Sequence, residues 1–140
     1  MQLKPIGVIH SRYRYPAEAP RQGRLQQDIS EIEVFPEYEA GLKDIEKKSH
    51  LIILYWCDRG TRDTIMTATP WDDRVRGVFA TRSPNRPNPI AFDLVDLISR
   101  DGNRLLVRGM DALDRSPLLD IKPYSHKLDS IMPGDAEGVD

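Results

Sequence analysis

Side chains able to take part in acid–base or ionic chemistry cluster near the end of the sequence. The segment between residues 111 and 124 carries three carboxylates, an ammonium and a phenol: Asp111, Asp114, Asp120, Lys122 and Tyr124. Carboxylates at this spacing repel one another unless cations or ligand hydroxyl groups lie beside them. A ligand with a diol, such as a ribose, would supply such hydroxyl groups. The alternative is a turn in which Asp111 or Asp114 accepts hydrogen bonds from backbone amides, and the segment taken alone favours that alternative.

A second segment is both rigid and basic. Prolines at positions 84, 87 and 89 fix the backbone between Arg82 and Ile90 and exclude a helix or a central strand there. The stiff loop displays the side chains of Arg82, Asn85, Arg86 and Asn88. Either this loop recognises a ligand with preorganised groups, or it closes a barrel and its arginines pair with nearby acids. The residues alone leave these two alternatives about even.

Several common chemistries are excluded by what the sequence lacks. It has no glycine-rich phosphate loop, which argues against nucleotide hydrolysis and a Rossmann cofactor site. Its three histidines, His10, His50 and His126, are widely spread, and with one cysteine they offer no zinc-ligand spacing, so we expect no metal site. We interpret Cys57 as a buried thiol at the end of a strand rather than as a nucleophile.

Length and composition indicate one globular domain. The 140 residues are 39% hydrophobic and 30% charged, enough to fold without disulfides. The single cysteine suits a reducing cytoplasm, and without a signal peptide or a long apolar run we expect no membrane role. The net charge of −2 argues against a protein that binds nucleic acid over its whole surface. However, residues 1–27 are basic and residues 28–46 acidic, so one basic face is possible.

The hydrophobic pattern predicts a mainly β fold. Alternating or continuous apolar runs of strand length occur at 5–11, 31–34, 51–56, 75–81, 90–98, 105–109 and 117–124. A long loop is expected up to Gln27, and Tyr38, Leu42 and Ile45 would share one face of a helix that begins at Pro36. Six or so short strands without a strand-helix rhythm favour a small, closed or partly open β-barrel with one or two helices. Residues 1–128 would form this domain, and residues 129–140 an acidic, frayed tail.

These segments carry a resemblance to a known family. Together with Pro20-Arg21-Gln22-Gly23 and Ser49-His50-Leu51, in the same order, they resemble the TsaA-like, TrmO-type S-adenosylmethionine-dependent tRNA methyltransferases. The resemblance runs from Ile6 to Tyr124. It implies a small β-barrel that forms a homodimer and binds the methyl donor near the subunit boundary. The reaction it implies is N6-methylation of N6-threonylcarbamoyladenosine, next to the anticodon of tRNA.

The resemblance also implies site residues. The positions that match the family's donor-binding residues are Pro20, Arg21, Gln22, His50, Leu51, Arg82, Phe92, Leu113, Asp114, Arg115 and Ser116. Family members commonly read Asp-Gly-Thr where this chain has Asp114-Arg115-Ser116, and Gly-Leu-Ser where it has Ala91-Phe92-Asp93. Because Arg115 adds bulk and charge and restricts the backbone, donor affinity or substrate choice would differ here. Many relatives also carry a C-terminal extension that this chain lacks.

Further roles are assigned as hypotheses from chemistry and position. The accepting nitrogen must lose a proton, and the candidates for its acceptor are Asp114, Asp120 and Tyr124. For the substrate, Lys122 would bind the carboxylate of the threonylcarbamoyl group, and Arg86 and Asn88 are further candidates for substrate binding. Arg82 and Arg86 would suit a phosphate or the carboxylate of the methyl donor. The alternatives are a methyltransferase of the same fold that acts on a small molecule or a protein, and a non-catalytic S-adenosylmethionine-binding module.

Overall fold

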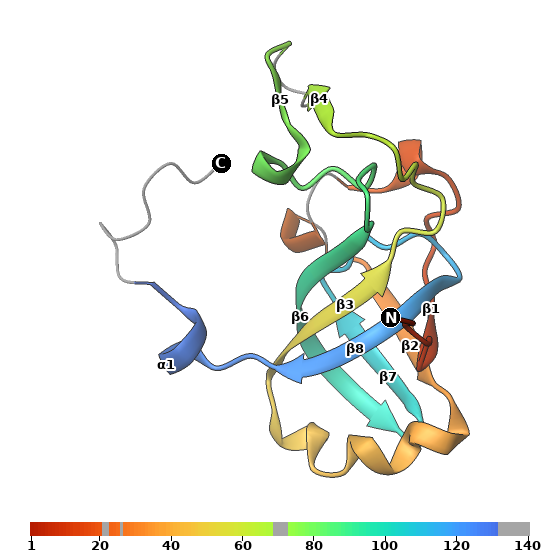
Figure 1. Cartoon of the computed structure of the whole chain (residues 1–140). Helices are drawn as coiled ribbons and strands as arrows, with labels where there is room; N and C mark the ends of the chain where they lie inside the picture. Colours follow the sequence, from red (N-terminus) through yellow and green to blue (C-terminus); the bar gives the residue numbers. More distant parts are fainter. Residues whose placement is uncertain (21–22, 26, 69–72, 132–140) are drawn as a thin grey trace.

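Six antiparallel strands close into a barrel in the computed structural model (Figure 1), which describes residues 1–20, 23–25, 27–68 and 73–131. Around the barrel the order is β1-β2-β7-β6-β3-β8. The strands are β1 (Gly7–His10), β2 (Ile29–Val34), β3 (His50–Trp56), β6 (Ile90–Asp101), β7 (Arg104–Arg108) and β8 (Ser116–Pro123). The predicted β-barrel is therefore confirmed, and the strand boundaries lie close to those the sequence indicates.

The interior of the barrel is filled by alternate residues of each strand. In β3, Leu51, Ile53 and Tyr55 are buried, whereas the residues between them are half-exposed. The fully buried members of the core come from all six strands: Ile9, Ile32, Leu51, Ile53, Val95, Leu105, Val107 and Leu118. Burial of each such side chain contributes about 1.5–3 kcal/mol, so period-two alternation fixes both the strands and the face they bury.

The predicted hairpin at Asp101-Gly102 joins β6 to β7. Asp101 pairs with Arg104, and the turn between them has Gly102 at φ 62, a left-handed conformation that glycine adopts without steric cost. Two irregularities bend the barrel, one in the β6–β7 pairing between Leu97 and Ser99 and one in the β3–β8 pairing after Leu54. Such bulges increase the twist that a six-stranded barrel needs in order to close.

The helix expected from Pro36 forms, but it is a 3-10 helix rather than an α-helix. The segment forms two 3-10 helices, Pro36–Leu42 and Ile45–Lys47, because the backbone breaks at Asp44, which has φ 71. Of the three residues expected to share one face, only Leu42 is fully buried, although Tyr38 and Ile45 still pack against the core. These short helices close the lower end of the barrel in Figure 1.

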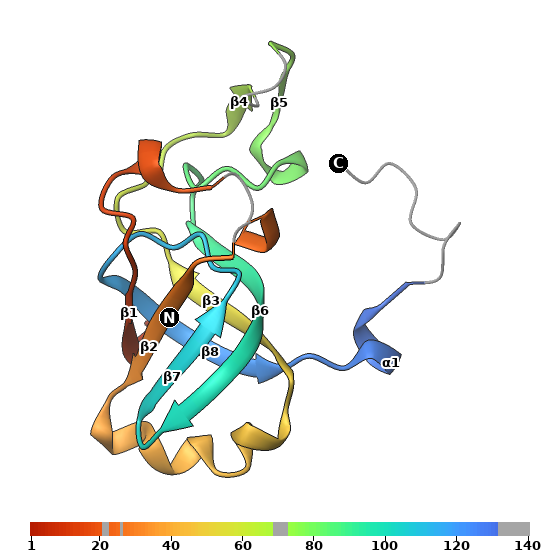
Figure 2. The ribbon, with the colours of Figure 1, turned by 180° about the vertical axis from the view of Figure 1, so that it is seen from behind.

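A two-stranded arm projects from the opposite end of the barrel (Figures 1 and 2). It pairs β4 (Met66–Ala68) with β5 (Val75–Gly77) and belongs to a separate sheet. The strand expected at 75–81 is therefore shorter than predicted, since the chain turns into a 3-10 helix at Val78–Ala80. No hydrophobic pattern marks β4, because three residues outside a core bury no apolar face.

The chain leaves the barrel again after β8. Helix α1 (His126–Asp129) lies apart from the strands in both views, with Ser125 accepting a capping hydrogen bond from the Leu128 amide. The expected boundary at residue 128 therefore falls inside this short helix. Most of the predicted tail, from 132 to 140, lies outside the described residues. Among the residues described, no helix combines the length and apolar character needed to cross a membrane.

Candidate functional site

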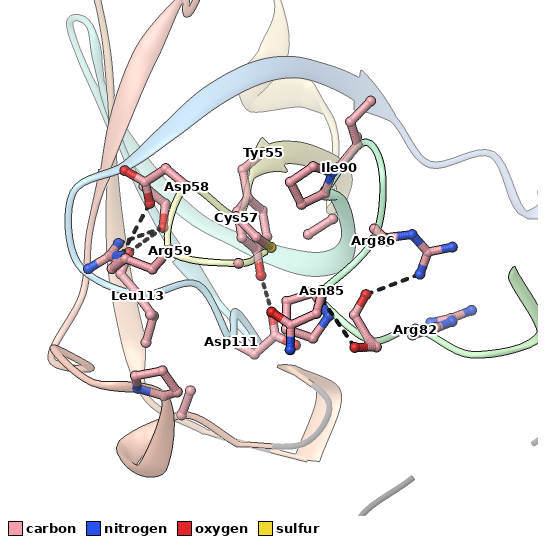
Figure 3. Close-up of a pocket in the computed structure, with 18 of the residues that line it drawn as sticks. Tyr55, Cys57, Asp58, Arg59, Arg82, Asn85, Arg86, Ile90, Asp111 and Leu113 are labelled. Carbon is pink, nitrogen blue, oxygen red and sulfur yellow. Dashed lines mark hydrogen bonds and ion pairs between the residues drawn. The ribbon is translucent and has the colours of Figure 1, made fainter. Parts of the chain in front are cut away.

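A cavity of about 510 Å³ opens at the end of the barrel that carries the arm (Figure 3). Four stretches of chain provide most of its wall: the end of β3 and the turn after it (55–60), the proline-rich loop (81–86), the start of β6 (89–92) and the turn before β8 (111–116). Pro16 and Ala19, from the long loop after β1, complete the lining. The two segments singled out in the sequence therefore meet at one cavity.

The proline-rich loop is fastened to the turn after β3. The Asn85 side chain accepts a hydrogen bond from the Thr61 amide at 2.9 Å, and the Arg86 amide donates to the Thr61 carbonyl at 3.0 Å. The Arg86 guanidinium donates to the carbonyls of Thr81 and Ser83. A Cβ on Gly60 would lie 2.5 Å from the Pro84 carbonyl oxygen, so the two loops touch where only glycine fits. Arg86 thus closes the loop through backbone carbonyls rather than through acids.

The floor of the cavity holds a carboxylate with two buried partners. The Tyr55 hydroxyl donates to Asp111 Oδ1 at 2.5 Å, as the dashed line in Figure 3 shows. Asp93, only 6% exposed, accepts a hydrogen bond from the Asp111 amide and shares another with the Asp111 side chain. Burial, followed by the charge of Asp111, raises the pKa of Asp93 well above its usual range. The fold therefore favours a neutral carboxyl at Asp93.

Burial also sets the chemistry of the cavity's thiol. Cys57 follows β3 and is half-buried, close to the position expected from the sequence. Burial first, and then the charges of Asp111 and Asp93, raise its pKa to about 12. Because the thiolate is the nucleophilic form, Cys57 is a poor nucleophile at neutral pH.

Guanidinium groups surround the cavity mouth. Arg82 lies over the half-exposed ring of Phe92, with its guanidinium carbon 5.9 Å from the ring centroid. Arg59 donates hydrogen bonds to the Asp114 carbonyl and to the Ser116 hydroxyl, which fixes the turn before β8. Cations beside an apolar ring form a surface that suits a ligand with both anionic and aromatic parts.

That turn contains a strained residue. Arg115 has φ 68, in the left-handed region that glycine adopts freely, and its side chain is 86% exposed. The neighbouring Asp114 carboxylate accepts a hydrogen bond from the Ser11 amide at 3.0 Å. Asp114 therefore accepts a hydrogen bond from a backbone amide, as in the alternative of a turn-forming aspartate.

The structure brings together some of the predicted site residues. Those that line the cavity are Arg82, Arg86, Phe92, Leu113 and Ser116. Asp114 and Arg115 lie in the turn before β8 but do not line the cavity, and Pro20 follows Ala19, which does line it. Arg21 and Gln22 lie outside the described residues. Asn88 does not line the cavity, since its side chain accepts a hydrogen bond from Arg62.

His50 and Leu51 lie at the opposite end of β3 from Tyr55. Leu51 is fully buried in the barrel core. The His50 ring is 42% exposed, and its Nε2 lies 3.2 Å from Asp96 Oδ1. Arg24 donates to the same carboxylate oxygen at 2.9 Å. The His50 imidazole therefore lies on the outside of the barrel and not in its core.

The three remaining candidates lie away from the cavity. Asp120 accepts a hydrogen bond from the Ile121 amide and pairs with Lys122 at 3.1 Å. It lines a second hollow of about 350 Å³ beneath the 3-10 helix that begins at Pro36. The Tyr124 ring packs edge-on against His50. Within one chain, Asp120 and Tyr124 are therefore not positioned to act in the larger cavity.

The sequence assigns no site role to Tyr55, Arg59 or Asp93, and Asp93 enters there only as a departure from the family pattern. Asp93 carries a further signal, because it occupies an inward position between Ala91 and Val95 in an alternating strand, where a charge is unexpected. Tyr55 lies within the continuous apolar run 51–56 and carries no such sign. In the described part of the chain, no group of three or more His, Cys, Asp or Glu side chains is placed to hold a metal ion.

Comparison with known proteins identifies the family. The family model described as "tRNA-methyltransferase O N-terminal domain" matches residues 8–130. This range contains the whole barrel from β1 to β8 apart from Gly7, and every described residue of the cavity lining. The chain belongs to the family of tRNA-methyltransferase O N-terminal domains.

Relatives from archaea and bacteria agree with that assignment. A "Probable S-adenosyl-L-methionine-binding protein" of Archaeoglobus fulgidus is 56% identical over 94% of this chain, which covers 36% of that protein. A second A. fulgidus protein, named "S-adenosyl-L-methionine-binding protein", is 49% identical, and the match covers 94% of both chains. The Escherichia coli "tRNA (adenine(37)-N6)-methyltransferase" is 35% identical over 88% of this chain and 57% of its own length.

A solved structure shares the fold. The crystal structure of TrmO from Pseudomonas aeruginosa superimposes with a TM-score of 0.80 at 32% sequence identity. The match covers 97% of this chain and 60% of that one. The chain thus spans the barrel portion of a longer relative.

Proposed function

We propose that this protein is an S-adenosylmethionine-dependent tRNA methyltransferase that acts on N6 of N6-threonylcarbamoyladenosine beside the anticodon. The observation that carries the proposal is the meeting of the proline-rich loop with the turn before β8 at one cavity, in a chain of this family. We place the protein with its tRNA substrate in the cytoplasm.

The cavity suits the methyl donor. Its volume of about 510 Å³ lies within the range of sites for ligands of this size. Phe92 and Leu113 offer apolar surface for an adenine ring, and Arg82 offers a cation for the donor's carboxylate. When bound, S-adenosylmethionine supplies an activated methyl group on a sulfonium.

We further propose that the protein acts as a homodimer. His50 and Phe92 lie on the same outer face of the β3–β6 pair, since the residues between them that point inward are buried. Phe92 is 49% exposed, and Leu128 and Ile131, on the segment that leaves the barrel, are 81% and 65% exposed. Pairing of two copies through this face would cover apolar surface and bring His50 of one copy toward the cavity of the other.

A methylation assay on tRNA tests the proposed function. Total tRNA from a strain that lacks the gene would be incubated with the protein and methyl-labelled S-adenosylmethionine. Label that is lost on nuclease treatment, and a mass increase of one methyl group on the anticodon-loop nucleoside, support the proposal. Label in the small-molecule or protein fraction would instead favour a methyltransferase of the same fold with another substrate.

A second candidate function is a donor-binding module without catalysis. It is favoured by the similarly sized A. fulgidus relative, which is named only for S-adenosylmethionine binding, and by the strained Arg115 in the turn beside the cavity. This candidate predicts that S-adenosylmethionine binds while no methyl group reaches any tRNA nucleoside.

A further inference from the structure

Among the carboxylates that line the cavity, Asp111 is the one set up to act on a bound substrate. The other, Asp58, is 42% exposed and pairs with Arg59 at 3.2 Å, so it is solvated and already has a cation beside it. Asp111 receives the Tyr55 hydroxyl from inside the barrel, and Tyr55 itself is only 4% exposed. The oxygen lone pairs that Tyr55 and Asp93 leave free are available to the cavity that Asp111 lines.

The buried partners of Asp111 both act as hydrogen-bond donors. The charged or titratable groups that face Asp93 are Tyr55 and Cys57 from the β3 side, Asp111 from the turn, and Arg82 from the proline-rich loop. Asp93 is the buried carboxyl of the two, at 6% exposed, and burial raises its pKa well above its usual range. Asp93 is therefore the protonated partner and donates to the side chain of Asp111, which lines the cavity.

We propose that the Asp111 carboxylate takes the proton from the methyl-accepting nitrogen, while Tyr55 and Asp93 act as positioning residues that hold this carboxylate. The inference rests on the proposed function and adds to it the group that accepts the proton. It differs from the candidates Asp114, Asp120 and Tyr124, none of which lines the cavity.

The step balances with these groups alone. The nitrogen forms a bond to the methyl carbon, and the carbon–sulfur bond breaks with its electron pair left on sulfur, which becomes a neutral thioether. The nitrogen's proton moves to an Asp111 oxygen, and solvent takes it after the products leave. One positive charge disappears from sulfur and one negative charge disappears from Asp111, so the cavity ends the step with no unpaired charge.

Asparagine can make the same two hydrogen bonds as a neutral Asp93. Its protonated carboxyl donates one hydrogen bond to the Asp111 side chain and accepts one from the Asp111 amide. An asparagine amide has one donor and one acceptor in the same places. Asp93→Asn should therefore preserve both the carboxylate's position and the activity, whereas Asp111→Asn removes the proton acceptor.

Kinetics of four single variants test the inference, with Asp101→Asn, at an exposed carboxylate in the β6–β7 turn, as the matched control. For Asp111→Asn we expect kcat to fall by about 100-fold to 10,000-fold, the range for loss of a general base, with KM and donor affinity by calorimetry changed by less than about threefold. Asp101→Asn should keep kcat within about threefold of the wild type, and Asp93→Asn, the conservative variant of a positioning residue, should retain most of the activity. Tyr55→Phe should shift the acidic limb of the kcat–pH profile to higher pH, because a carboxylate that loses a donor holds its proton more tightly.

The inference is overturned if Asp111→Asn keeps more than about a tenth of the wild-type kcat, or if Asp101→Asn loses as much as Asp111→Asn. The Tyr55→Phe profile is an independent readout, and it decides alone if Asp111→Asn does not fold: an unshifted limb overturns the inference. A wild-type protein that binds S-adenosylmethionine but transfers no methyl group to tRNA would overturn the proposed function itself, which is a different result from active wild type with active Asp111→Asn.

Discussion

Replacement of Asp93 by asparagine should change how the stability of the protein depends on pH. Asp93 is buried beside Asp111, and burial raises its pKa well above the value of about 3.9 that an aspartate has in an unfolded chain. Between those two pKa values the folded protein binds one proton more than the unfolded chain does. The free energy of unfolding of the wild type therefore falls as pH rises, by about 1.4 kcal/mol per pH unit for this one proton.

Asparagine carries no such proton, so Asp93→Asn removes this dependence. The free energy of unfolding of the variant should rise relative to that of the wild type by about 1.4 kcal/mol for each pH unit above about pH 4.5, until the pH reaches the pKa of folded Asp93. Above that pKa the difference between the two proteins stays constant. Urea unfolding at several values between about pH 4.5 and 7.5 measures the difference directly, since the two proteins differ in one carboxyl.

Asp96→Asn is the matched control because its linkage has the opposite sign. The hydrogen bond from Arg24 comes first among the causes that lower the pKa of Asp96. Asp96 is then ionised in both folded and unfolded states above about pH 4.5, and its removal also takes away the partner of His50, so Asp96→Asn should be less stable than the wild type throughout the range, whereas Asp93→Asn gains stability over it as pH rises. Parallel stability curves for Asp93→Asn and the wild type would refute a neutral Asp93.

Three further predictions concern stability. Arg115→Gly should stabilise the protein by about 0.5–1 kcal/mol, because it relieves a left-handed arginine while adding some backbone entropy to the unfolded chain, and urea unfolding measures the gain. Gly60→Ala should destabilise it by about 1–3 kcal/mol, because the new Cβ meets the Pro84 carbonyl, whereas Gly41→Ala, with open space around it, should not. Leu51→Ala should lower the free energy of unfolding by about 2–5 kcal/mol, as for a core leucine; a stable variant that had lost only donor affinity would contradict its place in the core.

Much of the barrel could be predicted from the sequence because its strands bury one face. In β2 the buried Ile32 and Val34 alternate with the half-exposed Glu31 and Glu33, and in β3 the run 51–56 is continuously apolar and of strand length, which predicts a buried strand. The β4–β5 arm carries no such pattern, because it packs on no core. The segment after Pro36 has helical spacing in its apolar residues, but left-handed Asp44 interrupts it, and nothing in the sequence marks that break.

The candidate site was predicted in part for a similar reason. Arg82 and Ser116 belong to segments whose unusual composition stands out, and the fold brings both to one cavity. His50 shares the same family pattern, but within one chain it lies at the other end of β3. Asp93 depends on a contact with Asp111 between residues distant in sequence, and such pairs become visible only when the barrel is closed.

The most direct measurement is a titration of isotope-labelled protein with S-adenosylmethionine, followed by its backbone amide resonances. If the donor binds in the larger cavity, the amides that shift will belong to residues 57–60, 81–92 and 111–116, around the walls described above. Unchanged spectra, or shifts confined to Glu37, Tyr38 and Asp120 at the second hollow, would contradict the assignment of this cavity.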